Sequence, residues 1–182
     1  MGLSEINKKI IAKGKYEEVI EINDHFYIVP KKQQIAVLPY TIDTKGLLDK
    51  VGVIKDYNYI LNAYNYTLIC GYINKDDETN LVAANRILFE IIKTNVTNAN
   101  KWMYLGNIFN GLMSDSPIDL YCVDITDIKI PETKEVVEII NNKKFELLDS
   151  SYVVTSDDML LLSSFLRLFN YFYVSSLEKY KK

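Results

Sequence analysis

The sequence predicts one α/β domain in which helices pack on a mixed sheet. The chain has 182 residues, of which 48% are apolar and 25% charged, the profile of an ordinary globular protein with a sizeable core. Short apolar runs bounded by turn residues are typical of strands, and longer segments of helical periodicity separate them. The order is strands, helix, strands, helix, with no repeat or linker, which favours a single mixed domain.

Residues 3–22 are predicted to form a polar, partly helical lead-in, because Ile6, Ile10 and Ile11 recur at helical spacing among lysines. The predicted organisation is therefore a lead-in at 1–24 and one domain at 25–182 that includes a long C-terminal helix. An irregular, tyrosine-rich stretch is expected at 58–65. Strands of the N-terminal half are expected at 25–30, 35–40, 51–57 and 66–72.

A helix is predicted from Thr79 to Lys93. Thr79 or Asp77 would cap its first turn, and Glu78 would favour the positive end of its dipole. The remaining elements are expected at 101–109, 120–126 and 144–148 as strands, and at 132–141 and 158–179 as helices.

Composition excludes several classes of function. The net charge is -3, and no dense run of lysine or arginine indicates a nucleic-acid surface. No apolar run reaches the roughly 18–20 residues of a membrane helix, and no signal peptide is visible. Cys70 and Cys122 lie in apolar, strand-like runs and are expected to be buried free thiols. His25, the single histidine, cannot build a histidine metal site alone.

One constellation carries a family resemblance. Gly71, Glu78, Arg86 and Glu90 are spaced so that residues 35–126 resemble the Nudix family, especially the branch that cleaves ADP-ribose and related nucleoside diphosphate derivatives. The resemblance implies a Nudix-like α/β/α sandwich with a mixed sheet. In active members of that family, carboxylates of the box helix hold Mg²⁺ against a pyrophosphate, as hard cations and oxygen ligands require.

The box departs from the family pattern where the ligands belong. Aligned on Glu78 and Arg86, the sequence keeps one helix acid, Glu90, and has Ile87 and Ile91 in place of the other two. A second register keeps the spacing from Gly71 and puts Asp77 at the first acid; the register with Glu78 preserves more of the pattern. In either register the box is vestigial, so no catalytic residue, metal or cofactor is expected, and Glu90 is expected to pair with Arg86 one turn away.

Other residues could restore a site. Asp115 and Asp119 lie where related enzymes carry an assisting acid, although turns rich in Ser, Asp and Pro are more often only turns. Aromatic side chains could stack a base, although at this tyrosine content packing in the core or an interface is the better explanation. The tyrosines concerned are Tyr57, Tyr59, Tyr64 and Tyr66.

The C-terminal helix is apolar nearly all round, which is typical of a helix buried on more than one side. One side would face the sheet, and the other would suit either the N-terminal lead-in or a partner subunit. Phe165, Phe169 and Phe172 are the candidate interface residues.

Three hypotheses of function remain. The first, which we favour, is a catalytically inactive Nudix-fold protein with a structural or adaptor role in a homo- or hetero-oligomeric assembly. The second is a divergent hydrolase that uses Glu78, Glu90 and a loop acid, and the third is a regulatory module that binds a nucleotide. Only Arg86 and Arg167 are arginines, and the richness in Lys, Asn and Ile is typical of an AT-rich genome. Together with the eroded box, this bias favours a bacteriophage neck or tail component, located in the virion and assembled in the host cytoplasm.

Overall fold

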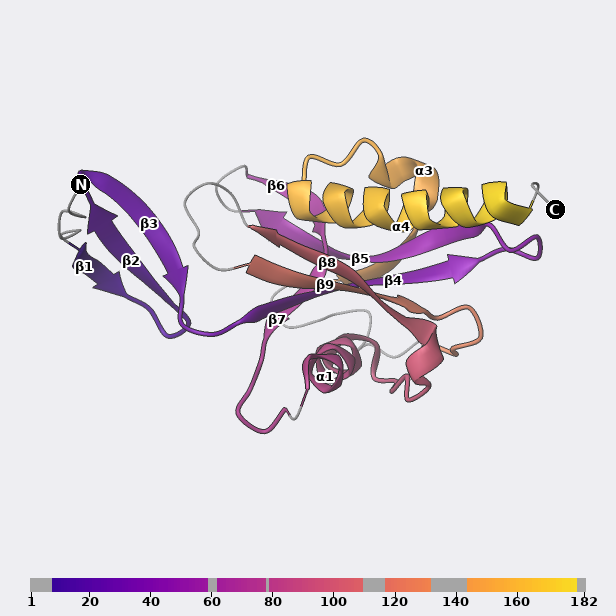
Figure 1. Ribbon diagram of the computed structural model, residues 1–182, viewed down its shortest axis with the longest axis horizontal. Coiled ribbons are helices and arrows are strands. Elements are labelled where there is room, and N and C mark those ends of the chain that lie inside the picture. The colour runs from indigo at the N-terminus through magenta and orange to yellow at the C-terminus, as the bar shows by residue number, and fades with distance from the viewer. Residues whose placement is uncertain (1–7, 59–61, 78, 110–116, 132–143, 180–182) are drawn as a thin grey trace.

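Two sheets and three helices make up the described part of the chain. A computed structural model describes residues 8–58, 62–77, 79–109, 117–131 and 144–179. A three-stranded sheet stands off one end of the body, which consists of a seven-stranded sheet with helices on both faces (Figure 1).

The small sheet is formed by β1 (Lys8–Lys13), β2 (Glu17–Ile22) and β3 (His25–Pro30), all antiparallel. The expectation of a partly helical lead-in is therefore wrong. Pairing of the β-branched residues Val19 and Ile20 with Ile28 and Tyr27 of β3 outweighs the helical spacing of the isoleucines. Asn23 and Asp24 have φ values of 51° and 63°, as a two-residue hairpin turn requires. The boundary expected at residue 25 thus cuts through this sheet.

The large sheet has the order β10-β5-β4-β9-β8, with β6 paired to β5 and β7 paired to β4. β4 runs parallel to β9, and the other pairings are antiparallel, so the sheet is mixed as expected. Its strands are β4 (Gln34–Ile42), β5 (Leu48–Asn58), β6 (Ala63–Thr67), β7 (Ile69–Tyr72), β8 (Trp102–Phe109), β9 (Pro117–Asp124) and β10 (Lys144–Asp149).

The described residues of the tyrosine-rich stretch lie largely in strands instead of the expected irregular segment. Asn58 pairs with Ala63 and Tyr57 with Tyr64, so β5 and β6 are paired up to these residues. The strand expected at 66–72 is split at Leu68, where the chain leaves β5 and joins β4 through β7. Cross-strand aromatic pairing explains why a segment rich in Asn and Tyr still forms strands.

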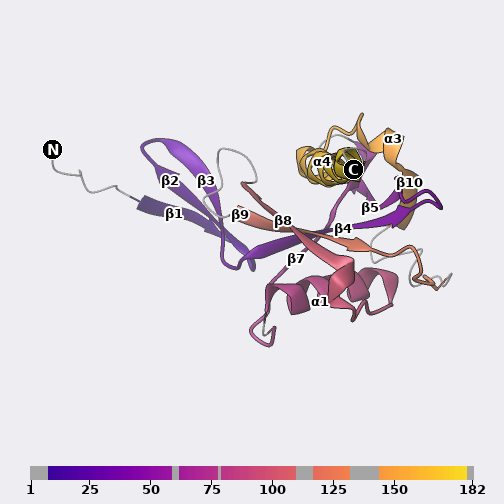
Figure 2. The same cartoon turned by 45° about the vertical axis from the view of Figure 1, so that its right-hand side comes forward.

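Helices cover both faces of the large sheet, which confirms the predicted α/β/α sandwich (Figures 1 and 2). α1 (Asn80–Ile92) packs on one face, and α3 (Ser150–Val153) and α4 (Met159–Lys179) pack on the other. A short 3-10 turn, η1, occupies Ala99–Lys101. Each face has its own apolar cluster: Ile35, Val37 and Leu88 belong to the cluster beneath α1, whereas Leu38, Leu120 and Leu168 belong to that beneath α4.

The helix expected at 132–141 lies outside the described residues. α1 and α4 match the helices expected at 79–93 and 158–179 to within one residue at each end. Within the described part of the chain, no helix is long and apolar enough to cross a membrane.

Candidate functional site

The loop between β7 and α1 carries the predicted box and ends at a defined helix cap. The Thr79 hydroxyl accepts a hydrogen bond from the backbone N–H of Val82 at 3.2 Å, so Thr79 is the N-cap, one of the two residues expected there. Lys93 closes the helix in the left-handed conformation and donates to the Phe89 carbonyl. Glu78 lies outside the described residues.

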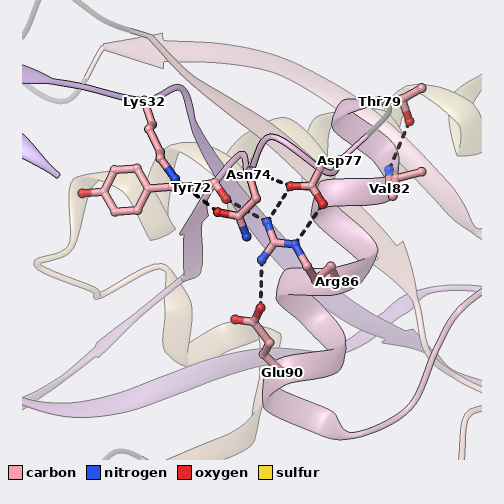
Figure 3. Close-up of polar contacts among 8 residues, drawn as sticks. All are labelled: Lys32, Tyr72, Asn74, Asp77, Thr79, Val82, Arg86 and Glu90. Carbon is pink, nitrogen blue, oxygen red and sulfur yellow. Dashed lines mark hydrogen bonds and ion pairs between the residues drawn. The ribbon is translucent and has the colours of Figure 1, made fainter. Parts of the chain in front are cut away.

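Arg86 is the centre of a polar cluster at this loop (Figure 3). Its Nε and Nη2 donate to the two carboxylate oxygens of Asp77 at 2.9 and 2.7 Å. Nη2 also donates to the Tyr72 carbonyl at 2.8 Å, and Nη1 donates to Glu90 Oε1 at 2.8 Å. Asp77 accepts a further bond from the backbone N–H of Asn74 at 2.7 Å. Arg86 therefore ties the end of β7, the loop and the helix together.

The electrostatics of the cluster favour both charged forms. Hydrogen bonds from Arg86 are the main cause that lowers the pKa of Asp77, against an opposing effect of partial burial. The same bonds raise the pKa of Arg86. A two-point contact between a guanidinium and a carboxylate is among the stronger hydrogen-bonded pairs, and the Asp77 side chain is only 5% exposed.

Among the described residues of the loop, Asp77 is the acid that pairs with Arg86. Glu78, the acid of the preferred register, is outside the described residues, so the choice between the two registers stays a prediction. Asp77 has the spacing from Gly71 of the second register, whereas Arg86 has the position of the first. The loop thus combines features of both registers. The pair expected between Arg86 and Glu90 is present, with the Glu90 side chain 59% exposed.

A buried isoleucine lies where the family resemblance implies a helix carboxylate. Ile87 is 2% exposed and belongs to the apolar cluster under α1. A Cβ atom added to Gly71 would lie 2.7 Å from Ile87 Cγ1 and 2.9 Å from its Cδ1, so the side chain packs directly on this glycine. Ile91 is half-buried against the same cluster. The stripe expected to replace the ligand acids is therefore part of the core.

These residues do not fit the Mg²⁺ ion that the family resemblance implies. A hard cation such as Mg²⁺ needs several oxygen ligands that converge on it, usually including carboxylates. Among the described residues of the box, Asp77 and one oxygen of Glu90 are bound by the Arg86 guanidinium, and the side chain of Ile87 is buried. Across the described residues, no cluster of three or more His, Cys, Asp and Glu side chains could hold a metal ion.

Asp119, a candidate assisting acid, lies in β9 and is 6% exposed. Its Oδ2 accepts from Gln33 Nε2 at 2.5 Å and from Asn80 Nδ2 at 2.8 Å, and its Oδ1 accepts from the Tyr104 hydroxyl at 2.9 Å. The carboxylate therefore links β8, β9, the start of α1 and the residue before β4. These hydrogen bonds satisfy the buried carboxylate. Asp115 lies outside the described residues.

A cavity of about 1030 Å³ lies on the side of the sheet that α3 and α4 cover. Tyr64 and Tyr66, two of the candidate base-stacking residues, line it. Tyr57 contacts Tyr64 edge to face, with ring centroids 5.2 Å apart, and Tyr59 lies outside the described residues. Cys70 also lines the cavity and is exposed, so the expectation that it is buried is wrong.

The three candidate interface phenylalanines of α4 differ in exposure. Phe165 is 2% exposed and belongs to the cluster under α4. Phe172 is half-buried and meets the Tyr40 ring edge to face at 5.5 Å. Phe169 is 50% exposed, and its ring stacks on that of Tyr173 at 6.4 Å. Only Phe169 of the three faces outward.

Sequence reasoning missed the residues that α3 and α4 contribute to the cavity. Tyr152 and Met159 lie at its edge, far along the chain from Tyr64. Their positions depend on how α4 packs on the sheet, and no local pattern encodes that packing. The Asp77–Arg86 pair could have been found, since the second register already placed an acid at Asp77.

Solved structures that resemble this chain agree on its fold. No family model and no curated protein matches the sequence. The crystal structure of an ADP compounds hydrolase is similar with a TM-score of 0.64 at 12% identity, over 96% of this chain and 98% of that one. A mutT/nudix family protein from Listeria innocua has a TM-score of 0.54 at 12% identity, over 81% and 98% of the two chains.

NrtR from Shewanella oneidensis is similar with a TM-score of 0.55 at 14% identity. The match covers 75% of this chain but only 61% of NrtR. At such low identity these likenesses show the fold and carry no activity over to this chain. The protein has the Nudix fold, which the eroded box and its flanking strands led us to expect.

Proposed function

We propose that this Nudix-fold protein does not hydrolyse nucleoside diphosphate derivatives and acts instead by binding, as a structural or adaptor subunit. The observation that carries the proposal is Ile87. It stands where the resemblance implies a metal-binding carboxylate, and it is 2% exposed against Gly71. An aliphatic side chain cannot coordinate a cation, and its burial leaves no room for water at that position.

The polar cluster supports the same proposal. Catalysis by Mg²⁺ needs carboxylates free to hold the ion against a pyrophosphate. In this protein, Arg86 binds both oxygens of Asp77 and one oxygen of Glu90. A cation at this loop would have to displace a two-point guanidinium contact, so the loop is suited to fixing α1 on β7.

The test is an assay of Mg²⁺-dependent hydrolysis of ADP-ribose, NADH and diadenosine polyphosphates. We expect no product above a control without protein, and an active Nudix hydrolase in parallel validates the assay. Product that depends on Mg²⁺ and disappears in Glu90→Gln would refute the proposal and favour the alternative, a divergent hydrolase.

The outward face of α4 is the surface proposed to bind other protein subunits. Leu166, Phe169 and Tyr173 are 49%, 50% and 55% exposed, and their spacing of three and four residues puts them on one face of the helix. Each large apolar side chain buried by a partner contributes about 1.5–3 kcal/mol. A few such residues are enough to hold an interface with a partner.

Light scattering on the purified protein at micromolar concentration tests this surface. We expect self-association that Phe169→Glu weakens without a matching loss of monomer stability. Phe89→Glu on α1 is the control, because Phe89 is 40% exposed on the opposite face. The proteins that co-purify with the protein from its native source give a second test. A protein that stays monomeric in light scattering and that co-purifies with no other protein would count against the assembly role.

The place of the protein in a bacteriophage particle stays a prediction. The co-purification that identifies its partners also tests that prediction. The regulatory alternative, a module that binds a nucleotide without cleaving it, is tested by the binding experiment below.

A further inference from the structure

The cavity beside α4 is large enough for a small-molecule ligand. Its volume of about 1030 Å³ lies at the upper end of the roughly 300–1000 Å³ that ligand sites usually have. Strand residues of β6 and β7 form one side, and residues 152–161 of α3, α4 and their connection form the other. Segments far apart in the sequence therefore create it together.

Its floor is apolar and buried. Ile118, Val153 and Leu161 line the cavity and are 3%, 1% and 1% exposed. They belong to the apolar cluster between the sheet and α4. A ring resting on this floor would lose its contact with water on one side.

The edge of the cavity carries large side chains that remain exposed. Tyr64 of β6, Tyr152 of α3 and Met159 of α4 are 55%, 67% and 71% exposed, and all three line it. Rings and a thioether placed in this way suit a flat aromatic partner, since aromatic rings stack and methionine adapts its shape. Exposed apolar groups that converge on a cavity indicate a binding site more than isolated ones do.

The charge of the lining is negative. Among the described residues that line the cavity, the charged ones are Asp157 and Asp158. Asp158 Oδ1 accepts from the backbone N–H of Leu161 at 2.8 Å, so a carboxylate already occupies the positive end of α4. Lys55 contacts the Tyr64 and Tyr66 rings with its Nζ at 5.5 and 5.8 Å from their centroids, but it is not among the lining residues. A phosphate group would therefore meet two carboxylates.

We propose that this cavity binds a planar aromatic molecule that carries no negative charge, either neutral or cationic. The apolar floor and the aromatic edge hold the ring, and Asp157 and Asp158 select against anions. The inference does not depend on the assembly role proposed above, because the cavity and the outward face of α4 use different residues.

Isothermal titration of the full-length protein with two matched pairs of probes tests the proposal. Tryptamine and indole-3-acetate share a ring and differ in the sign of their charge, and adenosine and ADP differ by the phosphates. In each pair we expect the member without negative charge to bind at least about tenfold more tightly. This is a difference of about 1.4 kcal/mol, which lies between the energies of a close contact of two like charges in bulk water and near a protein surface.

Charge reversal at the edge separates electrostatic selection from simple shape. Asp157→Lys should reduce the preference against indole-3-acetate and ADP, because Asp157 is exposed and lines the cavity. Asp49→Lys changes the net charge equally at an exposed position outside the lining, and should leave the preference unchanged. Tyr152→Ser should weaken binding of tryptamine and adenosine while the melting temperature stays close to that of the parent.

Three results would overturn the proposal. One is tighter binding of ADP than of adenosine, which would favour the nucleotide-binding module. Another is an equal response of the preference to Asp157→Lys and Asp49→Lys. The third is failure of all four probes to bind at up to about 1 mM, the weak limit of specific recognition.

Discussion

Replacing Ile87 with glutamate introduces a carboxyl group at the position where the family resemblance implies a metal-binding carboxylate. The fold has no room for water around this group. Ile87 is 2% exposed and packs on Gly71, so the new group would be buried without a partner. We expect Ile87→Glu to destabilise the protein strongly at pH 7 and to confer neither Mg²⁺ binding nor hydrolysis.

Two contributions set the size of this loss. Removing the apolar side chain from the core costs about 1.5–3 kcal/mol. A buried carboxyl group stays protonated at pH 7, about 2.7 pH units above its ordinary pKa of about 4.3, which costs about 3.7 kcal/mol at 1.36 kcal/mol per unit. The sum, about 5–7 kcal/mol, approaches the whole stability of a typical domain, about 5–15 kcal/mol.

The pH dependence distinguishes this explanation from a simple packing defect. A carboxyl group whose pKa is raised by folding destabilises the protein at pH values above its ordinary pKa, and acidification removes the penalty. Between pH 7 and pH 5, Ile87→Glu should therefore regain about 2.6 kcal/mol relative to Ile87→Gln, which has similar volume and no charge. Urea unfolding of both variants at the two pH values measures the difference. Equal stability of the two variants at pH 7, or a rise in the melting temperature of Ile87→Glu with Mg²⁺, would show that the position is open and polar and refute the reasoning.

Three further predictions concern the loop and the sheet. The folded-state pKa of Asp77 is lowered, so the stability that its pair with Arg86 contributes is fully present above the ordinary value of 3.8 and is lost as the pH falls through the folded pKa. Acid unfolding of Asp77→Asn should therefore lack this loss of stability at low pH. An acid dependence of stability unchanged from that of the parent would contradict the prediction. Gly71→Ala should lower the free energy of unfolding by about 1–3 kcal/mol because its Cβ would overlap Ile87. In a double-mutant cycle, Ile87→Val should recover part of this loss. Additive effects of the two substitutions would argue against a contact between residues 71 and 87. Asp119→Asn should lower the free energy of unfolding in urea by about 1–3 kcal/mol, since an amide cannot accept hydrogen bonds from all three donors. An unchanged stability would mean that the buried network readily rearranges.

The fold could largely be predicted because its main elements carry strong local patterns. The apolar run of β4 and the capped, amphipathic α1 appear where expected. The small N-terminal sheet could not be recognised, since Ile10 and Ile11 fit a helix as well as a strand until their pairing partners are known. Whether Ile87 lies in a cleft or in the core could not be decided from spacing either, because Ile87 and Leu88 are neighbours on the helix and both turn out to be buried.

The candidate site shows the same limit. The pair between Arg86 and Glu90 was predictable, because residues one turn apart on a helix are neighbours. The bond between Arg86 and Asp77 depends on the path of the loop between β7 and α1, which residue spacing alone does not determine. The cavity depends on the packing of α4 against β6 and neighbouring strands, which lie far from it along the chain.

The two separate apolar clusters also affect how the chain can tolerate change. Ile87 and Leu88 belong to the cluster beneath α1, whereas Phe165 and Leu168 belong to the one on the far side of the sheet. Substitutions with no shared contacts generally act additively, so a substitution under α1 should leave the packing of α4 largely untouched. Each face of the sheet can therefore be altered while the other keeps its apolar cluster.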